Sequence, residues 1–358
     1  MTLIPPRFTL GVYHVKLFNF LMIKKKCFGF KYDTYIVIGE GAVTGTIEVY
    51  DNTLTLVQTI SGAHSDQVNH LKLLPNGNFA SCSDDNTVII WNPTRNPSSK
   101  VLTYTSHTSN VMGLESLTST LIASGSQDST LRIWNINTGA TLININVGVQ
   151  VWGLRLLLNS FLASGHSDGS IKVWFYTTGT LQYTLSGGHT DTVTDIETIS
   201  TTVIASSSKD FNVVIWNLIS RTVTSTLIGH TDQVYSLKLL SVNLLASGSN
   251  DKSVKFWDVT TGTIVRTLSP VNADWVKWSL NLYDTNTLIT GSLDKTMDFF
   301  QISTGKLCRS ITANIVIKSL LFVGNRKIFL IHLSLLLPSI HEKDINFKNR
   351  KNYFIFNY

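Results

Sequence analysis

Aromatic residues recur along this chain at an almost constant interval. Five tryptophans, Trp91, Trp134, Trp174, Trp216 and Trp257, are separated by 43, 40, 42 and 41 residues. Tyr50 and Phe300 extend this column by 41 and 43 residues on either side. A fixed period of roughly 20 to 50 residues indicates a repeat architecture, in which one structural unit is built several times. The column therefore predicts seven units.

Polar residues keep fixed distances from these aromatics. Ten residues before the last six aromatics lies a hydroxyl residue: Ser81, Ser124, Ser164, Ser206, Ser247 and Thr290. Six residues before them lies an aspartate: Asp85, Asp128, Asp168, Asp210, Asp251 and Asp294. A histidine lies 27 residues before four of the tryptophans: His64, His107, His189 and His230. Columns this regular indicate contacts that every unit repeats.

Each unit reads as four short strands separated by turns. In the unit of Trp257, apolar segments 234–240 and 244–248 are followed by the turn 249–252, an alternating strand 254–257 and a last strand 263–268. A lone four-stranded antiparallel blade cannot bury both of its faces, so the blades must stack around an axis. The pattern predicts an all-β fold, a single β-propeller of four-stranded antiparallel blades.

The strings in this unit resemble a known repeat. Gly229-His230-Thr231-Asp232, Leu245-Ala246-Ser247-Gly248-Ser249 and Val254-x-Phe256-Trp257-Asp258 are similar to a WD (Trp-Asp) repeat, and similar strings cover about 35–305. The resemblance implies a hydrogen-bonded chain of His, Ser, Asp and Trp inside each blade. Complete sets are His64, Ser81, Asp85, Trp91; His107, Ser124, Asp128, Trp134; His189, Ser206, Asp210, Trp216; and His230, Ser247, Asp251, Trp257.

Two units lack part of this set. The unit of Trp174 has Val147 at the histidine position, and the unit of Phe300 has Ala273 there and no indole. Because buried polar groups without partners cost about 1 to 3 kcal/mol each, we expect these two blades to be locally weaker.

The closure of the ring is open to two interpretations. Segments 317–323 and 328–331 are either the first strands of an incomplete eighth blade, or a substitute for the inner strand that the first unit lacks. We favour seven blades. We expect an atypical basic N-terminal segment at 1–34, the propeller at 35–335 and a basic, disordered tail at 336–358.

The charge of the chain is divided unevenly. The net charge is +6, yet 35–305 contains 14 basic and 20 acidic residues, a net of −6, so the excess of positive charge lies at the ends. The charge therefore does not favour nucleic-acid binding by the body of the protein. The alternative function is an RNA- or membrane-associated adaptor that uses the basic termini.

Several features predict an intracellular protein, cytoplasmic or nuclear and not secreted. Three cysteines provide no disulfide framework, and the apolar run 328–337 is too short to span a bilayer. At the N-terminus, the apolar stretch precedes Lys24, Lys25 and Lys26, the reverse of a signal peptide.

Tempting catalytic and metal motifs have structural interpretations. Gly165-His166-Ser167-Asp168-Gly169 fits a nucleophile elbow, but its place in the repeat is a turn between two strands. The four repeated histidines lie in different units, so they are not a metal site. We therefore predict no enzyme, cofactor, metal or small-molecule substrate; a propeller hydrolase is the least favoured alternative.

Variation beside a constant column indicates a partner surface. Residues next to the repeated valines, and just before the aspartates, are expected to ring the mouth of the central channel. There, aromatic residues among amides are typical of interface hot spots. The predicted partner-binding residues are Trp152, Tyr235, Trp275, Met112, Lys277, Gln67, Gln150, Gln233 and Lys209. Alternatively, Trp152 and Tyr235 only pack at the junctions between blades.

These residues predict a protein–protein interaction scaffold or adaptor. Its partner would be a peptide or protein bound at the channel mouth, and the chain itself a monomeric propeller within a complex.

Overall fold

The computed structural model describes residues 35–42, 44–93, 99–268 and 279–323. These residues form 28 strands and no helix. The segments 1–34 and 324–358 lie outside this part, and so do Ala273, Trp275 and Lys277. The predicted domain boundaries at 34 and 335 and the predicted tail therefore cannot be compared with the structure.

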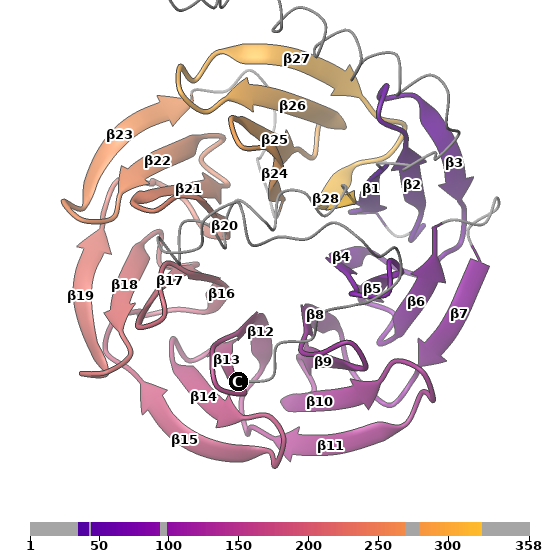
Figure 1. Cartoon of the computed structure of the whole chain (residues 1–358), viewed down its shortest axis with the longest axis horizontal. Helices are drawn as coiled ribbons and strands as arrows, with labels where there is room; N and C mark the ends of the chain where they lie inside the picture. Colours follow the sequence, from indigo (N-terminus) through magenta and orange to yellow (C-terminus); the bar gives the residue numbers. More distant parts are fainter. Residues whose placement is uncertain (1–34, 43, 94–98, 269–278, 324–358) are drawn as a thin grey trace, which may run out of the picture. The chain divides into compact units, whose positions relative to one another are not determined.

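The strands form seven antiparallel four-stranded sheets, the blades, which are arranged as a ring (Figure 1). The strands of each blade are given below from the inner strand outward. Blade 1 contains β28 (Ile317–Val323), β1 (Tyr35–Glu40), β2 (Ile47–Tyr50) and β3 (Leu56–Ile60). Blade 2 contains β4 (Val68–Leu73), β5 (Phe79–Ser83), β6 (Val88–Asn92) and β7 (Ser99–Tyr104). Blade 3 contains β8 (Val111–Ser116), β9 (Leu121–Ser126), β10 (Thr130–Asn135) and β11 (Thr141–Asn146).

The remaining four blades follow the same order. Blade 4 contains β12 (Val151–Leu156), β13 (Phe161–His166), β14 (Ile171–Phe175) and β15 (Thr180–Leu185). Blade 5 contains β16 (Val193–Thr198), β17 (Val203–Ser208), β18 (Val213–Asn217) and β19 (Thr222–Leu227). Blade 6 contains β20 (Val234–Ser241), β21 (Leu244–Ser249), β22 (Val254–Asp258) and β23 (Thr263–Leu268). Blade 7 contains β24 (Leu280–Asp284), β25 (Thr287–Gly291), β26 (Thr296–Gln301) and β27 (Leu307–Thr312).

The prediction of a seven-bladed propeller is confirmed, and β28 closes the ring. This strand pairs antiparallel with β1, from Tyr35 opposite Val323 to Gly39 opposite Ser319. Segment 317–323 is therefore the inner strand of blade 1, and the alternative of an eighth blade is wrong. The first blade thus combines strands from both ends of the described chain, which fastens the ring.

The core lies between neighbouring blades. Ile90 of blade 2 packs in one cluster with Leu114 and Trp134 of blade 3, and comparable clusters join the other blades. The inner strands approach each other so closely that a Cβ on Gly113 would lie 2.2 Å from the carbonyl oxygen of Trp152. Glycine is required at this position because a side chain would push β8 and β12 apart.

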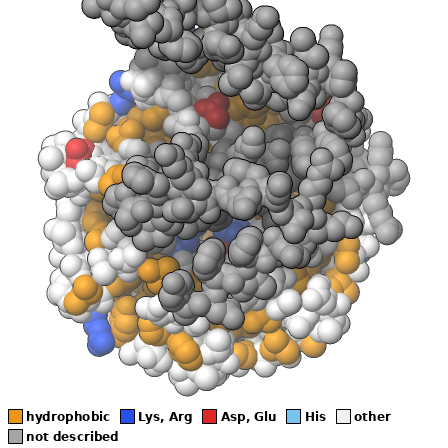
Figure 2. Space-filling view, viewed as in Figure 1, with side chains coloured by type: hydrophobic (Ala, Val, Ile, Leu, Met, Phe, Trp, Pro, Cys, Tyr) orange, Lys and Arg blue, Asp and Glu red, His pale blue; other side chains and the backbone are white. Residues whose placement is uncertain are grey.

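The circumference of the ring is formed by the outer strands. Exposed aliphatic side chains recur on them, at Val57, Val101, Leu142, Leu181, Val223 and Ile264. Figure 2 shows hydrophobic side chains, in orange, along this edge. Because they recur on the outer strands of blades 1 to 6, with Val265 as a second one in blade 6, they reflect the repeat rather than a single continuous patch.

The two opposite faces of the ring carry different loops and turns. One, which we call the mouth face, carries the described loops between blades and the turns between the second and third strands of each blade. These elements are hydrogen-bonded to each other; for example, the amide of Asp84 donates to the carbonyl of Gln67 at 3.0 Å. The opposite face carries the other described turns, which join the first to the second strand or the third to the fourth strand of a blade and are linked by bonds such as Tyr176 N–H to Ser160 O at 3.1 Å.

Candidate functional site

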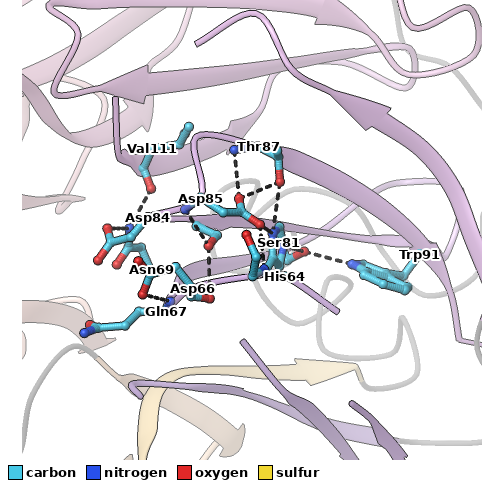
Figure 3. A network of polar contacts seen from close by, with 12 residues as sticks. His64, Asp66, Gln67, Asn69, Ser81, Asp84, Asp85, Thr87, Trp91 and Val111 are labelled. Atoms are coloured by element: carbon cyan, nitrogen blue, oxygen red, sulfur yellow. Dashed lines mark hydrogen bonds and ion pairs between the residues drawn. The ribbon is translucent and has the colours of Figure 1, made fainter. Parts of the chain in front are cut away.

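A chain of buried side chains fastens the mouth-face loop of blade 2 to the blade interior (Figure 3). His64 contacts Asp85 through Nδ1 at 2.9 Å and Ser81 Oγ through Nε2 at 2.7 Å. Trp91 donates its indole N–H to the same Ser81 Oγ at 2.8 Å. Burial alone would raise the pKa of Asp85, but hydrogen bonds from His64 and Thr87 outweigh it, and the pKa lies well below its usual value.

The same chain occurs in blades 3, 5 and 6. The distances from histidine Nδ1 to aspartate are 2.8, 2.9 and 2.7 Å, and those from tryptophan Nε1 to serine are 2.7 Å in each blade. The aspartate also accepts the backbone N–H that follows the histidine, at Thr108, Thr190 and Thr231. Each network therefore joins an inter-blade loop, a turn and two strands of one blade.

In blade 4 a histidine of the second strand replaces the one that the inter-blade loops of blades 2, 3, 5 and 6 provide. His166 of β13 contacts Ser164 Oγ through Nε2 at 2.8 Å, and Trp174 donates to that Oγ at 2.7 Å. The inter-blade loop is held instead by Lys172, whose Nζ donates to the carbonyl of Val147 at 3.0 Å. Burial, and then the charge of Lys172, lower the pKa of His166 to about 4, so this imidazole is neutral at physiological pH.

Blade 1 uses a carboxylate to hold its inter-blade loop. Tyr50 donates its hydroxyl to Glu48 Oε2 at 2.6 Å, and Asn314 of the preceding inter-blade loop donates to Glu48 Oε1 at 2.9 Å. Glu48 lies two residues before the aromatic column, as does Lys172 in blade 4. In blade 7, Asp298 occupies this position and is fully buried.

At the mouth, the structure brings two of the predicted columns together. The residue before each aspartate donates its backbone N–H to the residue before the repeated valine: Asp84 to Gln67, Gln127 to Asn110, Ser167 to Gln150, Lys209 to Thr192 and Asn250 to Gln233, at 2.9 to 3.1 Å. The loops and turns of the mouth face thus form one hydrogen-bonded rim in blades 2 to 6.

The predicted partner-binding residues divide into two layers at this rim. Trp152, Tyr235 and Met112 are each 8% exposed, whereas the side chains of Gln67, Gln150, Gln233 and Lys209 are half-buried. The ammonium of Lys209 lies 4.0 Å from the ring centre of Trp152, and Tyr235 donates its hydroxyl to Gln233. The aromatic residues therefore form a floor beneath polar side chains.

A partial ring of charges, on the inner strands of blades 2 to 6, was not predicted from the sequence. Four residues after the repeated valines, the column reads Lys72, Glu115, Arg155, Glu197 and Lys238, with alternating sign. Lys72 contacts Glu115 at 2.8 Å and Arg155 is paired with Glu197, each pair joining neighbouring blades. Figure 2 shows Lys and Arg side chains, in blue, near the middle of the ring. The alternation itself is the signal that could have revealed this ring.

Two further titratable groups lie on the inner strands. Burial raises the pKa of Asp195 to about 6, although Asp195 Oδ2 accepts the N–H of Leu237 from the next blade at 2.9 Å. Burial, and then the charges of Lys72 and Arg155, lower the pKa of His70 to about 3. His70 Nδ1 accepts the N–H of Leu114, so it joins two blades as a neutral acceptor.

The elbow-like segment has a structural role in blade 4. Its His166 is fully buried against Ser164, and the backbone N–H of Ser167 donates to Gln150 in the rim. Among the described residues, no three His, Cys, Asp or Glu side chains form a group that could hold a metal ion. A helix long and apolar enough to cross a membrane is likewise not found in the described part.

Comparison with known proteins agrees with this architecture. The family model for the WD domain, G-beta repeat, matches residues 54–92, 98–135, 151–174, 179–217 and 221–258. A computationally designed protein, Ika8, superposes with a TM-score of 0.62 at 26% identity, over 79% of this chain and 86% of its own.

Curated relatives match only locally. DDB1- and CUL4-associated factor 10 of Xenopus tropicalis is 45% identical over 64 residues, 18% of this chain and 14% of that protein. The human protein of the same name is 44% identical over 64 residues, 11% of its length. The matched region thus spans about a seventh or less of these relatives. The five matched repeats and the seven-bladed ring place this chain in the WD-repeat family.

Proposed function

We propose that this protein is a non-enzymatic interaction scaffold that binds a peptide or protein partner on the mouth face. The observation that carries the proposal is the rim, where half-buried polar side chains lie over Trp152 and Tyr235 in loops fixed by hydrogen bonds. A rigid rim loses little conformational entropy on binding, and aromatic residues framed by amides are favoured at interfaces.

The titratable side chains of this face support binding rather than catalysis. Each of the four repeated histidines contacts an aspartate through Nδ1 and a serine through Nε2, so both ring nitrogens serve the blade network in His64, His107, His189 and His230. The names of the curated relatives describe factors associated with other proteins, which is consistent with an adaptor role inside the cell. That match covers only a small part of each protein. We therefore characterise the partner from the binding site and not from the names of the relatives.

The test compares partners of the full chain and of a rim variant. Gln150→Ala, Lys209→Ala and Gln233→Ala together remove half-buried side chains of the rim and leave the backbone hydrogen bonds in place. We expect affinity capture and mass spectrometry to show partners lost from this variant. Circular dichroism and thermal unfolding must show that it is folded.

A control variant addresses the opposite face. Leu158→Ala, Ile219→Ala and Val242→Ala truncate side chains that are 55, 76 and 67% exposed in turns of that face. This variant should keep the partners that the rim variant loses. The proposal is wrong if the rim variant keeps every partner, or if the control variant loses the same ones.

A further inference from the structure

Three aspartates in the inter-blade loops of the mouth face are held in place without an ion pair to any described residue. They are Asp66, Asp191 and Asp232, and each uses Oδ1 to accept the backbone N–H of the residue that follows. The backbone carbonyl of each accepts a serine hydroxyl from the adjoining turn, at 2.9 to 3.1 Å. Asp191 is exposed and the other two are partly exposed, so the loops present fixed carboxylates with acceptor capacity remaining.

Buried acceptor oxygens lie at the same rim. Asn69 donates Nδ2 to Asp84 Oδ1 at 2.7 Å and to the carbonyl of Val111 at 2.9 Å, which fixes the orientation of its amide (Figure 3). Its Oδ1 accepts no hydrogen bond from a described residue, although Asn69 is only 3% exposed. Asn250 is 9% exposed, and its Oδ1 is also without a donor in the described structure. Unsatisfied acceptors of this kind favour a ligand that supplies N–H donors.

The rim already holds cations of its own. Lys209 places its ammonium 4.0 Å from the ring centre of Trp152, a cation–π contact. Lys318 donates Nζ to Gln67 Oε1 at 2.7 Å. The aromatic faces and amide oxygens of the rim are therefore suited to ammonium and guanidinium groups, and residues 35–305 as a whole carry a net charge of −6.

We infer that the partner of the mouth face is a polypeptide segment rich in Arg and Lys, a deepening of the proposed function on which it rests. Arginine and lysine side chains carry only donors, which matches the three carboxylates and the unsatisfied amide oxygens. Fixed carboxylates also attract a cationic segment before contact and speed its association.

The experiment measures binding of labelled peptides to the full chain by fluorescence anisotropy. The probes are a peptide of alternating Arg and Ser and a matched peptide of alternating Glu and Ser. The test variant carries Asp66→Asn, Asp191→Asn and Asp232→Asn, which keep the Oδ1 acceptors and remove three charges. The control variant carries Asp51→Asn, Asp258→Asn and Asp284→Asn, three aspartate-to-asparagine changes at residues that begin turns of the opposite face.

We expect the Arg peptide to bind the wild type and the control variant, and the Glu peptide to bind neither. The test variant should bind the Arg peptide about tenfold or more weakly, and higher salt should weaken the wild type toward it. The inference is overturned if the Glu peptide binds as well as the Arg peptide. It is also overturned if the test variant binds the Arg peptide like the wild type, or if the Arg peptide does not bind.

Captured partners separate this inference from the proposed function. If the Gln150, Lys209 and Gln233 variant loses partners while the Arg peptide fails to bind, the mouth is a binding site for a different chemistry. If that variant keeps all its partners, the proposed function itself fails, whatever the peptides do.

Discussion

Blades 5 and 4 solve the same problem with different side chains. In blade 5, His189 lies in the inter-blade loop and contacts both Asp210 and Ser206. In blade 4 the equivalent loop lacks a histidine, and His166 reaches Ser164 from within β13, while Lys172 holds the loop by its carbonyl. The comparison separates two tasks that one histidine performs in blade 5: satisfying the serine and fastening the loop.

The largest effect should come from removing the serine where both tasks depend on it. Ser206→Ala leaves the indole N–H of Trp216 and one ring nitrogen of His189 buried without this partner. At about 1 to 3 kcal/mol for each group, we expect a loss of roughly 2 to 6 kcal/mol in the free energy of unfolding. Urea denaturation followed by tryptophan fluorescence measures this loss.

Ser65→Ala is the matched control, because Ser65 is exposed and only its backbone N–H is used in the network of blade 2. It should leave the denaturation midpoint unchanged. Equal midpoints for both variants would show that the buried network adds nothing to stability.

A smaller effect is expected from the titration of His166. Its folded pKa of about 4 lies below the ordinary value of 6.5, so the unfolded chain binds the proton more readily. The stability due to the neutral imidazole is present above pH 6.5 and is lost as the pH falls toward 4. Between pH 7.5 and pH 5 this group should account for a loss on the order of 2 kcal/mol.

The measurement is a set of denaturation curves for wild type and His166→Gln across this pH range. Glutamine retains an amide that can reach Ser164 but does not titrate, so the variant should lose less stability on acidification. Parallel pH profiles for the two proteins would contradict a neutral, buried His166.

The sequence predicts those features of the two blades that recur in every repeat. The columns predicted the fold and the seven blades, because every blade repeats the same spacing between aromatic and polar residues. They did not predict that His166 contacts Ser164, since a contact found in one blade leaves no column. The charged residues of the channel have a regular spacing in the sequence but vary in sign. Their proximity follows from the arrangement of the inner strands.

The mouth shows the same limit. Adjacent columns indicated which residues ring the channel, and the rim hydrogen bonds join two of those columns. The burial of Trp152 and Tyr235 beneath the amides depends on side-chain packing between blades, which the spacing of residues in one chain does not encode.

Replacing the lysine of blade 4 should loosen only the loop. Lys172→Met removes the bond to the carbonyl of Val147, and we expect a loss of about 1.5 to 3 kcal/mol because hydrogen bonds to charged groups contribute in this range. Hydrogen exchange at the amides of 147–150 should quicken, while the amides of β13 stay protected. Lys255→Met, at the same position of blade 6, is the control, because its loop is held by His230 and Asp251. If both variants exchange alike, Lys172 does not fasten the loop.

The smallest effect concerns the aspartate that follows Trp257. Asp258 Oδ1 accepts the backbone N–H groups of Thr260 and Thr261 at 2.8 and 3.0 Å, and takes no part in the buried network. Asn135 and Asn217 make the same two bonds in blades 3 and 5 through Oδ1. Asp258→Asn should therefore unfold at the wild-type midpoint at pH 7, whereas Asp258→Ala should unfold earlier because the turn loses its acceptor. If the asparagine variant were as unstable as the alanine variant, the charge of Asp258 rather than its acceptor oxygen would hold the turn, and blades 3 and 5 would need another account of how their asparagines suffice.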